Sequence, residues 1–178
     1  TPTPTPTPTV NPLIQSHIYV ANENNSFTQC DINESGLDET SCKTFTTTGS
    51  GALSYPIGVA VDSNQHLFIS NFGDNGITQC NLDSLGNVDP ASCLTSTIST
   101  NLNPEGMAIY NGNLYIANNY TSSNLALSCS LAPTGINIGS CMTLSSTNVN
   151  NTIRAEDIVF DNYHAFLTDY QYGYIQCN

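Results

Sequence analysis

The chain has 178 residues and a formal net charge of −12 at pH 7, with Lys43 and Arg154 as its two basic residues. Binding to phosphates or to an anionic membrane surface needs several cationic groups, so this composition argues against nucleic acid and acidic lipid as partners. The sequence has no run of 18 apolar residues and therefore predicts no membrane span. The length is typical of a single domain with its own core.

The first nine residues, TPTPTPTPT, alternate threonine and proline, and we expect residues 1–16 to form an N-terminal arm outside the folded domain. One interpretation is a semi-rigid polyproline-II spacer. The other is an extended strand, in which successive N–H groups point to opposite sides. The prolines would then share one edge. The opposite edge would carry the N–H groups that can pair with a sheet, which belong to Thr1, Thr3, Thr5, Thr7 and Thr9.

Four similar blocks follow one another along the rest of the chain. Each contains a short apolar run followed by a cysteine, as in HLFISN and ITQC of the second block. The repeat-equivalent cysteines lie about 50 residues apart, at Cys30, Cys80, Cys129 and Cys177. A period of this length indicates a repeat architecture, and residues 17–178 are predicted to form one domain built from it.

The second block predicts four strands, called a to d here, because its apolar residues alternate with a period of two between turn residues. These strands are Gly58–Asp62, His66–Asn71, Ile77–Leu82 and Cys93–Thr100. Four strands in such a unit are typical of a β-propeller blade. The first block lacks a convincing strand a, and the fourth stops after strand c. The sequence therefore predicts an all-β propeller of about three and a half to four blades, at residues 17–48, 56–100, 104–147 and 155–178, with 14 strands in total.

The runs PIGVAVDSNQHLFISN, from Pro56 to Asn71, and PEGMAIYNGNLYIAN, from Pro104 to Asn118, resemble the NHL and YVTN-type β-propeller repeat. The resemblance covers nearly everything after residue 16. The fourth copy departs from the pattern, because Ala155-Glu156-Asp157 stands where the others have Pro-x-Gly. The resemblance implies the propeller fold, and that fold hosts binding modules, structural proteins and hydrolases alike.

Six of the seven cysteines form pairs at a regular spacing, each with one cysteine in strand c and the next at the start of strand d. Opposed residues on antiparallel strands are close enough for a disulfide. We therefore predict three bonds that staple the blades, Cys30–Cys42, Cys80–Cys93 and Cys129–Cys141, and we predict Cys177 to be unpaired within its own blade. Three disulfides imply an oxidising, extracytoplasmic compartment. The chain starts at Thr1 without a visible signal peptide, which we interpret as a processed mature N-terminus.

Two sets of residues are candidates for chemistry. His17, His66 and His164 occupy the same repeat position at the turn into strand b, which favours a structural role over general base catalysis. Glu105, Glu156 and Asp157 enter strand a, which lines a propeller's channel. The resemblance to calcium-dependent gluconolactonase-like propellers implies a possible Ca²⁺ site there. Further oxygen ligands could come from the ends of the b strands, at Asn71, Asn118 and Asp169. The alternative is that the acidic side chains are solvated at a loop, since the second blade has Ile57 in place of Glu105.

Asn-x-Ser/Thr sequons begin at Asn24, Asn33, Asn119 and Asn150. In a chain this rich in Asn, Ser and Thr, such sequons are also expected by chance.

Three functions remain open. The leading hypothesis is a secreted, non-enzymatic structural or adhesive subunit whose copies assemble head to tail into a filament, the arm of one completing the open end of the next. The second is glycan binding between blades, which the absence of Trp and the repeat positions of Tyr19 and Tyr115 weaken. The third is a calcium-dependent hydrolase. For the ends of the chain, the alternatives are a ring closed within one chain and a fragment of a longer propeller.

Overall fold

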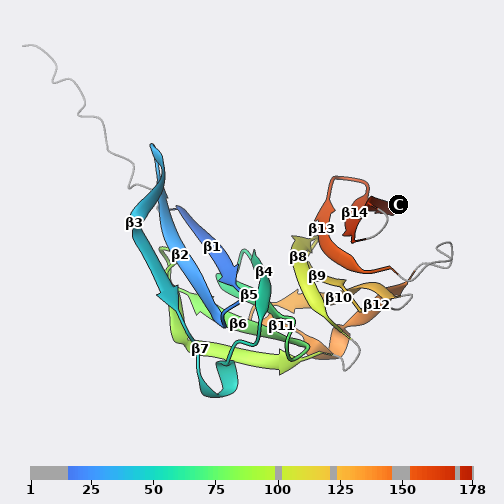
Figure 1. The fold of residues 1–178 in the computed structure, drawn as a ribbon, viewed down its shortest axis with the longest axis horizontal. Coiled ribbons are helices and arrows are strands. Elements are labelled where there is room, and N and C mark those ends of the chain that lie inside the picture. The colour runs from blue at the N-terminus through green and yellow to red at the C-terminus, as the bar shows by residue number, and fades with distance from the viewer. Residues whose placement is uncertain (1–15, 99–101, 121–123, 146–152, 171–172, 178) are drawn as a thin grey trace, which may run out of the picture.

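The computed structural model describes residues 16–98, 102–120, 124–145, 153–170 and 173–177, and in this part of the chain strands predominate (Figure 1). The strands form four consecutive antiparallel sheets, one for each predicted blade. In chain order they are β1 (Ser16–Asn22), β2 (Ser26–Asn33) and β3 (Gly36–Phe45); β4 (Pro56–Val61), β5 (His66–Asn71), β6 (Gly76–Leu82) and β7 (Val88–Thr97); β8 (Pro104–Tyr110), β9 (Asn113–Asn118), β10 (Asn124–Ala132), β11 (Gly135–Ile136) and β12 (Met142–Ser145); and β13 (Ala155–Phe160), β14 (Ala165–Asp169) and β15 (Gly173–Cys177). Two 3₁₀ turns, at Gly49–Gly51 and Ile138–Ser140, complete the described elements.

The four sheets follow one another along an open arc (Figure 1). The strands on its inner side contact each other in turn, β1 with β4, β4 with β8 and β8 with β13. The first and fourth sheets lie at opposite ends of the molecule's long axis. The all-β, bladed architecture is therefore confirmed. The alternative of a ring closed within one chain is wrong for the described residues, because their end sheets are far apart.

The outer strands begin earlier than the sequence analysis predicted. In the second blade β7 starts at Val88 and not at Cys93, because Val88 pairs with Leu82 near the tip of the β6–β7 hairpin. In the first blade β3 starts at Gly36 for the same reason. In the third blade the hairpin tip forms a separate two-residue strand, β11. The described residues thus contain 15 strands and not the 14 expected.

A repeated irregularity in each hairpin explains how the strand continues past its cysteine. The ladder between β6 and β7 shifts register between Gln79 and Asn81, and the extra residues bulge out of β7. Ser92 holds this bulge, because its hydroxyl accepts a hydrogen bond from the Asn81 N–H (2.8 Å) and donates one to the Asp89 carbonyl (2.6 Å). Ser41 and Ser140 make the equivalent contacts in the first and third blades. The signal is a repeated Asp/Asn-x-x-Ser-Cys motif, which the sequence analysis missed.

Each bulge carries a disulfide. The bonds are Cys30–Cys42, Cys80–Cys93 and Cys129–Cys141, each with 4.1 Å between Cα atoms, and they join the pairs expected from the spacing. Cys177 is free and half-buried, and burial raises the pKa of its thiol. A raised thiol pKa leaves less reactive thiolate at neutral pH.

Apolar side chains form three clusters, one between each pair of neighbouring sheets. Between the first and second sheets Phe27 packs with Leu67 and Ile69. Between the second and third, Phe68 and Ile77 pack with Leu114 and Ile116 among others. The third cluster joins the third and fourth sheets, with Ala117, Ala126, Ile158 and Leu167 among its members. The stability of this fold therefore comes mainly from sheet-on-sheet burial between successive blades.

Among the described residues no helix has the length and apolar character needed to cross a membrane.

The Cys80–Cys93 bond should contribute measurably to stability. Replacing both cysteines by alanine should lower the free energy of unfolding by about 3 kcal/mol, because the bond closes a loop of about 13 residues in the unfolded chain. Urea unfolding followed by circular dichroism measures the change. The matched control, Cys177→Ala, should cost substantially less, since it breaks no cross-link. Equal losses in the two variants would contradict the proposed contribution of the disulfide.

Candidate functional site

The predicted acidic residues meet along the inner side of the arc. Glu105, Glu156 and Asp157 line a groove of about 530 Å³ together with backbone and apolar groups of β4, β8 and β13. The structure therefore brings together side chains that lie some 50 residues apart in the sequence, as expected for residues that enter strand a in successive blades.

Glu105 is already engaged by protein groups. Its carboxylate accepts a hydrogen bond from the Asn119 side-chain amide, and the Asn119 Oδ1 accepts one from Arg154 Nε at 2.8 Å. Glu105 and Asn119 are both buried. This chain of contacts joins the third sheet to the segment that enters β13.

The other proposed oxygen ligands serve the backbone. Asn71 Oδ1 accepts a hydrogen bond from the N–H of Ser54 (3.2 Å). Asn118 and Asp169 accept equivalent bonds from the residues that precede strand a in their own blades, Asn103 (3.0 Å) and Arg154 (2.8 Å). The polar residue at the end of each strand b thus fixes the chain that enters strand a. Its repeated occurrence reflects this structural role.

The groove does not fit a calcium site. Within the described ranges, no group of three or more His, Cys, Asp or Glu side chains is placed to hold a metal ion. The Asp157 carboxylate accepts a hydrogen bond from the N–H of Ile158 at 2.8 Å. Since Ca²⁺ takes six to eight oxygen ligands, Glu105, Glu156 and Asp157, which are not grouped to hold an ion, do not make a binding site.

Burial raises the pKa of the Glu105 carboxyl above its usual range. The hydrogen bond from Asn119 opposes this rise, the Glu156 charge adds to it, and the Arg154 charge opposes it. The folded protein therefore binds a proton at Glu105 more tightly than the unfolded chain does.

The three histidines hold turns and loops. The imidazole of His66 donates to the Asp62 carboxylate at 2.8 Å, and the His66 N–H donates to the same group. His164 repeats this arrangement with Asp161, with 3.3 Å between the ring nitrogen and the carboxylate. The sequence LIQS before His17 contains no aspartate, and the Nε2 of His17 donates to the Leu85 carbonyl of the second blade at 2.8 Å.

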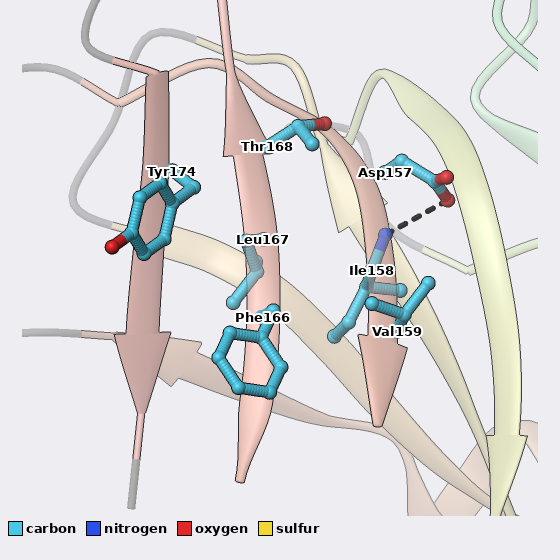
Figure 2. A pocket seen from close by; sticks show the side chains of 7 residues that line it. All are labelled: Asp157, Ile158, Val159, Phe166, Leu167, Thr168 and Tyr174. Carbon is cyan, nitrogen blue, oxygen red and sulfur yellow. Dashed lines mark hydrogen bonds between the residues drawn. The ribbon is translucent and has the colours of Figure 1, made fainter. Parts of the chain in front are cut away.

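A second, smaller hollow lies on the fourth sheet (Figure 2). It measures about 120 Å³, and its lining is mainly apolar. The lining residues are Asp157, Ile158, Val159, Phe166, Leu167, Thr168 and Tyr174. Ile158 and Leu167 belong to the cluster shared with the third sheet. Side chains alternate between the two faces of a sheet. Val159, Phe166 and Tyr174 therefore lie on the face of the fourth sheet that is turned away from the third sheet.

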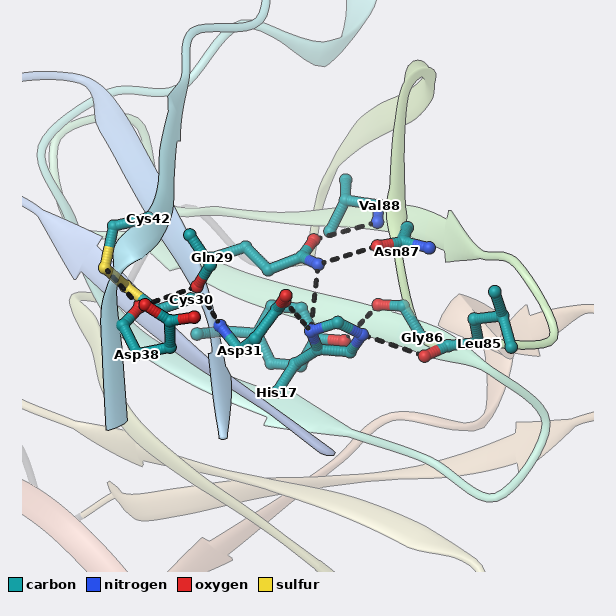
Figure 3. A network of polar contacts seen from close by, with 12 residues as sticks. His17, Gln29, Cys30, Asp31, Asp38, Cys42, Leu85, Gly86, Asn87 and Val88 are labelled. Atoms are coloured by element: carbon teal, nitrogen blue, oxygen red, sulfur yellow. Dashed lines mark hydrogen bonds and ion pairs between the residues drawn. A yellow bond between two sulfur atoms is a disulfide. The ribbon is translucent and has the colours of Figure 1, made fainter. Parts of the chain in front are cut away.

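A network of polar contacts joins the first blade to the second (Figure 3). Gln29 on β2 accepts a hydrogen bond from the Val88 N–H at 3.0 Å and donates one to the Asn87 side chain at 3.2 Å. Tyr19 donates to the carbonyl of Gly86 in the same hairpin tip. Side chains of the first sheet therefore bind the tip of the β6–β7 hairpin, mainly at its backbone groups.

The same contact recurs at the next interface. Gln79, which is equivalent to Gln29, accepts a hydrogen bond from the Ile136 N–H (3.1 Å) and donates one to the Thr134 carbonyl (3.0 Å). We call this arrangement the glutamine clamp: a glutamine directly before the first cysteine of one blade holds the hairpin tip of the next. The sequence analysis missed its signal, which is the repeated Gln-Cys pair.

The clamp requires glycine at the hairpin tip. Gly135 has a φ of +108°, and a Cβ there would lie 2.0 Å from the Gln79 Oε1. Gly86 has a φ of +90°, and its Cβ would lie 2.6 Å from His17 Cδ2. Any larger residue would be strained at these φ values and would also displace the side chain of the preceding blade.

The structure also bears on the sequons. The side chain of Asn119 is buried and hydrogen-bonded to both Glu105 and Arg154, so a glycan on it is incompatible with this fold. Asn24 and Asn33 are exposed, and Asn150 lies outside the described residues.

Replacing Glu105 by glutamine should flatten the pH dependence of stability. A carboxyl whose pKa is raised on folding adds stability below its unfolded pKa, and this contribution is lost as the pH rises through the folded pKa. Wild-type protein should therefore lose more unfolding free energy than Glu105→Gln between acidic and neutral pH, as measured by urea titrations at several pH values. The exposed control, Glu39→Gln, should follow the wild-type curve. A Glu105→Gln curve parallel to wild type would contradict the assigned effect of burial.

No protein-family model matches the chain, and no curated protein matches it. Solved structures do. A chain of a nidogen–laminin complex is 17% identical with a TM-score of 0.62, and the match covers 87% of this chain and 53% of that one. Virginiamycin B lyase from Staphylococcus aureus is 18% identical with a TM-score of 0.53, covering 82% and 42%. A gluconolactonase from Xanthomonas campestris is 15% identical with a TM-score of 0.50, covering 84% and 52%.

These structures are β-propellers, and the chain spans about half of their length. At such low identity the likeness shows the fold alone, and the fold is that of a β-propeller.

Proposed function

We propose that the protein is a secreted, non-enzymatic structural or adhesive subunit. Its copies assemble head to tail into a filament, and the N-terminal arm of one copy adds a strand to the open end of the next. The three disulfides fit an oxidising, extracellular environment. The three histidines are engaged in turn and interblade contacts, and Glu105 is bonded to Asn119, which supports a non-enzymatic role.

The observation that carries the proposal is the edge of the fourth sheet. In the described part of the chain this sheet has the order β13-β14-β15, whereas the second has four strands, so β15 lacks the partner that β7 provides for β6. A strand edge presents unpaired N–H and C=O groups and is a template for an added strand. Among the described residues, the first sheet, β1-β2-β3, likewise lacks the strand that β4 provides in the second.

The arm has the composition for this purpose. Its threonine N–H groups are available along one edge of an extended strand, and its prolines block the other edge against further addition. Because no further strand could pair with the proline edge, each open sheet end would accept the arm of one other subunit. The arm itself lies outside the described residues, so its pairing remains a prediction.

The comparisons are consistent with more than one function. One structure with this fold comes from a nidogen–laminin complex, and two others are a lyase and a gluconolactonase. The fold therefore favours neither assembly nor catalysis, and the proposal depends on the open sheet edge and the arm.

The arm can be tested without changing its length. Replacing Thr3, Thr5 and Thr7 by proline removes the N–H groups that would pair, so filaments should be lost or strongly shortened. Replacing the same residues by serine keeps every N–H group and should leave assembly unchanged. Negative-stain electron microscopy and light scattering measure the outcome. Filaments of equal length from the proline and serine variants would refute strand donation by the arm.

A further inference from the structure

The two end faces of the arc carry side chains of the same kinds as those that are buried in the interfaces between the sheets. In the second blade, Phe68, Ile77 and Gln79 lie on the face that packs against the third sheet. Strand register places Phe166, Tyr174 and Gln176 at the equivalent positions of the fourth blade. In the interior interface Phe68 and Ile77 are buried. In the fourth blade Tyr174 is 72% exposed and Gln176 is also exposed.

The face around Tyr174 is apolar and hollowed. Val159, at the position of Ala60 in the second blade, is 54% exposed. Together with Phe166 and Tyr174 it borders the hollow seen in Figure 2. We call the surface formed by Val159, Phe166, Thr168, Tyr174 and Gln176 the tail face.

The opposite end of the arc has the complementary half of an interface. Ile18 and Val20 on β1 are 40% and 43% exposed. Ile18 pairs with the first cysteine of its blade, as Leu114 on β9 does in the third blade, so Ile18 and Val20 are equivalent to Leu114 and Ile116. Leu114 and Ile116 are fully buried against the second sheet. Leu37, equivalent to Val88, is 51% exposed. We call the surface formed by Ile18, Val20, Ile32 and Leu37 the head face.

The hairpin tip of the first blade also lacks the contact that its counterparts make. Gly36 has a φ of +111°, like Gly86 and Gly135, yet a Cβ on it would meet nothing within 4 Å. At Gly86 and Gly135 the same position is filled by a side chain of the preceding blade. The third blade has Ser128 at the clamp position, next to a fourth sheet that has no such hairpin among the described residues. Gln176 is thus a clamp glutamine without a described tip, and Gly36 lies in a tip without a described clamp.

We propose that the tail face of one copy binds the head face of a second copy and reproduces the interior blade-to-blade interface. In this contact the Gln176 Oε1 accepts a hydrogen bond from the Leu37 N–H of the second copy, as Gln79 does from Ile136. Tyr174 and Val159 then pack over Ile18 and Val20. Because the two faces are different surfaces, the association is heterologous and runs head to tail.

The occupant is a second copy because the chain itself carries both halves of the interface. The interior interfaces of this chain show which residues such a contact buries, and the end faces repeat them at the same register. The inference rests on the proposed function for the head-to-tail direction, but it does not depend on the arm. Since the chain spans about half of the similar propeller structures, two copies hold enough blades for a closed ring. Rotation at the contact decides between a ring and an open filament.

A mixing experiment tests the contact. Val20→Glu places a charge in the head face only, and Tyr174→Glu places one in the tail face only. We expect wild-type protein to associate and each variant alone to be monomeric in analytical ultracentrifugation. Mixed in equal amounts, the two variants should form a 1:1 complex, because one intact tail face and one intact head face remain. A symmetric tail-to-tail contact predicts instead that Val20→Glu still dimerises alone. That result, or a wild-type protein that stays monomeric, would overturn the inference.

The clamp is tested separately. Gln176→Ala should raise the dissociation constant of the 1:1 complex about tenfold when it is introduced into the Val20→Glu variant, since hydrogen bonds to buried backbone groups are lost. Ser63→Ala, which changes an exposed turn residue, should leave the constant unchanged. An unchanged constant for Gln176→Ala would show that Gln176 does not clamp the second copy.

Deleting residues 1–9 separates this inference from the proposed role of the arm. If the truncated variants still form the 1:1 complex while the truncated protein with both faces intact no longer forms filaments, the face contact stands and the arm acts in addition. If the truncated variants form the complex and filaments of the truncated protein persist, strand donation is wrong and the face contact stands. Two results together would overturn the face contact. The truncated variants would no longer form the 1:1 complex, and full-length Val20→Glu and Tyr174→Glu would each still associate alone despite the added charge.

Discussion

Packing of one sheet on the next is the constraint on which the structure depends. The second and third sheets each bury one apolar face against the preceding sheet and the other against the following one, and the three clusters between the four sheets contain most of the buried apolar residues. The glutamine clamp adds direction to this otherwise non-directional burial. It joins a glutamine side chain of one blade to backbone groups at the hairpin tip of the next. The clamp therefore specifies which blade follows and how the two blades are aligned. Among the described residues, one face of the first sheet and one face of the fourth have no sheet packed on them.

The fold was largely predictable from the sequence, because a repeat that alternates with a period of two specifies both strands and faces. The pairing of Cys80 with Cys93 followed from the same regularity. The bounds of the outer strands were not predictable in this way, since the Ser92 bulge lets β7 pair on both sides of its cysteine. A serine in a loop is a weak signal when only one copy is considered. Its meaning becomes clear only when the three hairpins are compared as structures.

The candidate site illustrates the limit of inference from residue type. Glu105, Glu156 and Asp157 do lie together along the inner groove, as their repeat positions indicated. What sequence could not reveal was that Asn119, from the loop after β9, donates to the Glu105 carboxylate and that Arg154, before β13, donates in turn to Asn119. Carboxylates near a channel are therefore as well explained by interblade contacts as by metal binding. Gln29 and Gln79 were overlooked for the opposite reason, because their amide side chains suggest no chemistry until their backbone partners are seen.

In the proposed head-to-tail association, a second copy is recognised at the hairpin tip of the first blade. Hydrogen exchange of the peptide that spans residues 33–38, followed by mass spectrometry over a range of protein concentrations, examines this tip directly. Protection of these amides should rise with concentration as copies associate, whereas the peptide that contains Ile136 should be protected at every concentration because Gln79 holds it within one chain. Exchange at residues 33–38 that stays fast and independent of concentration, while the particles grow, would contradict the account.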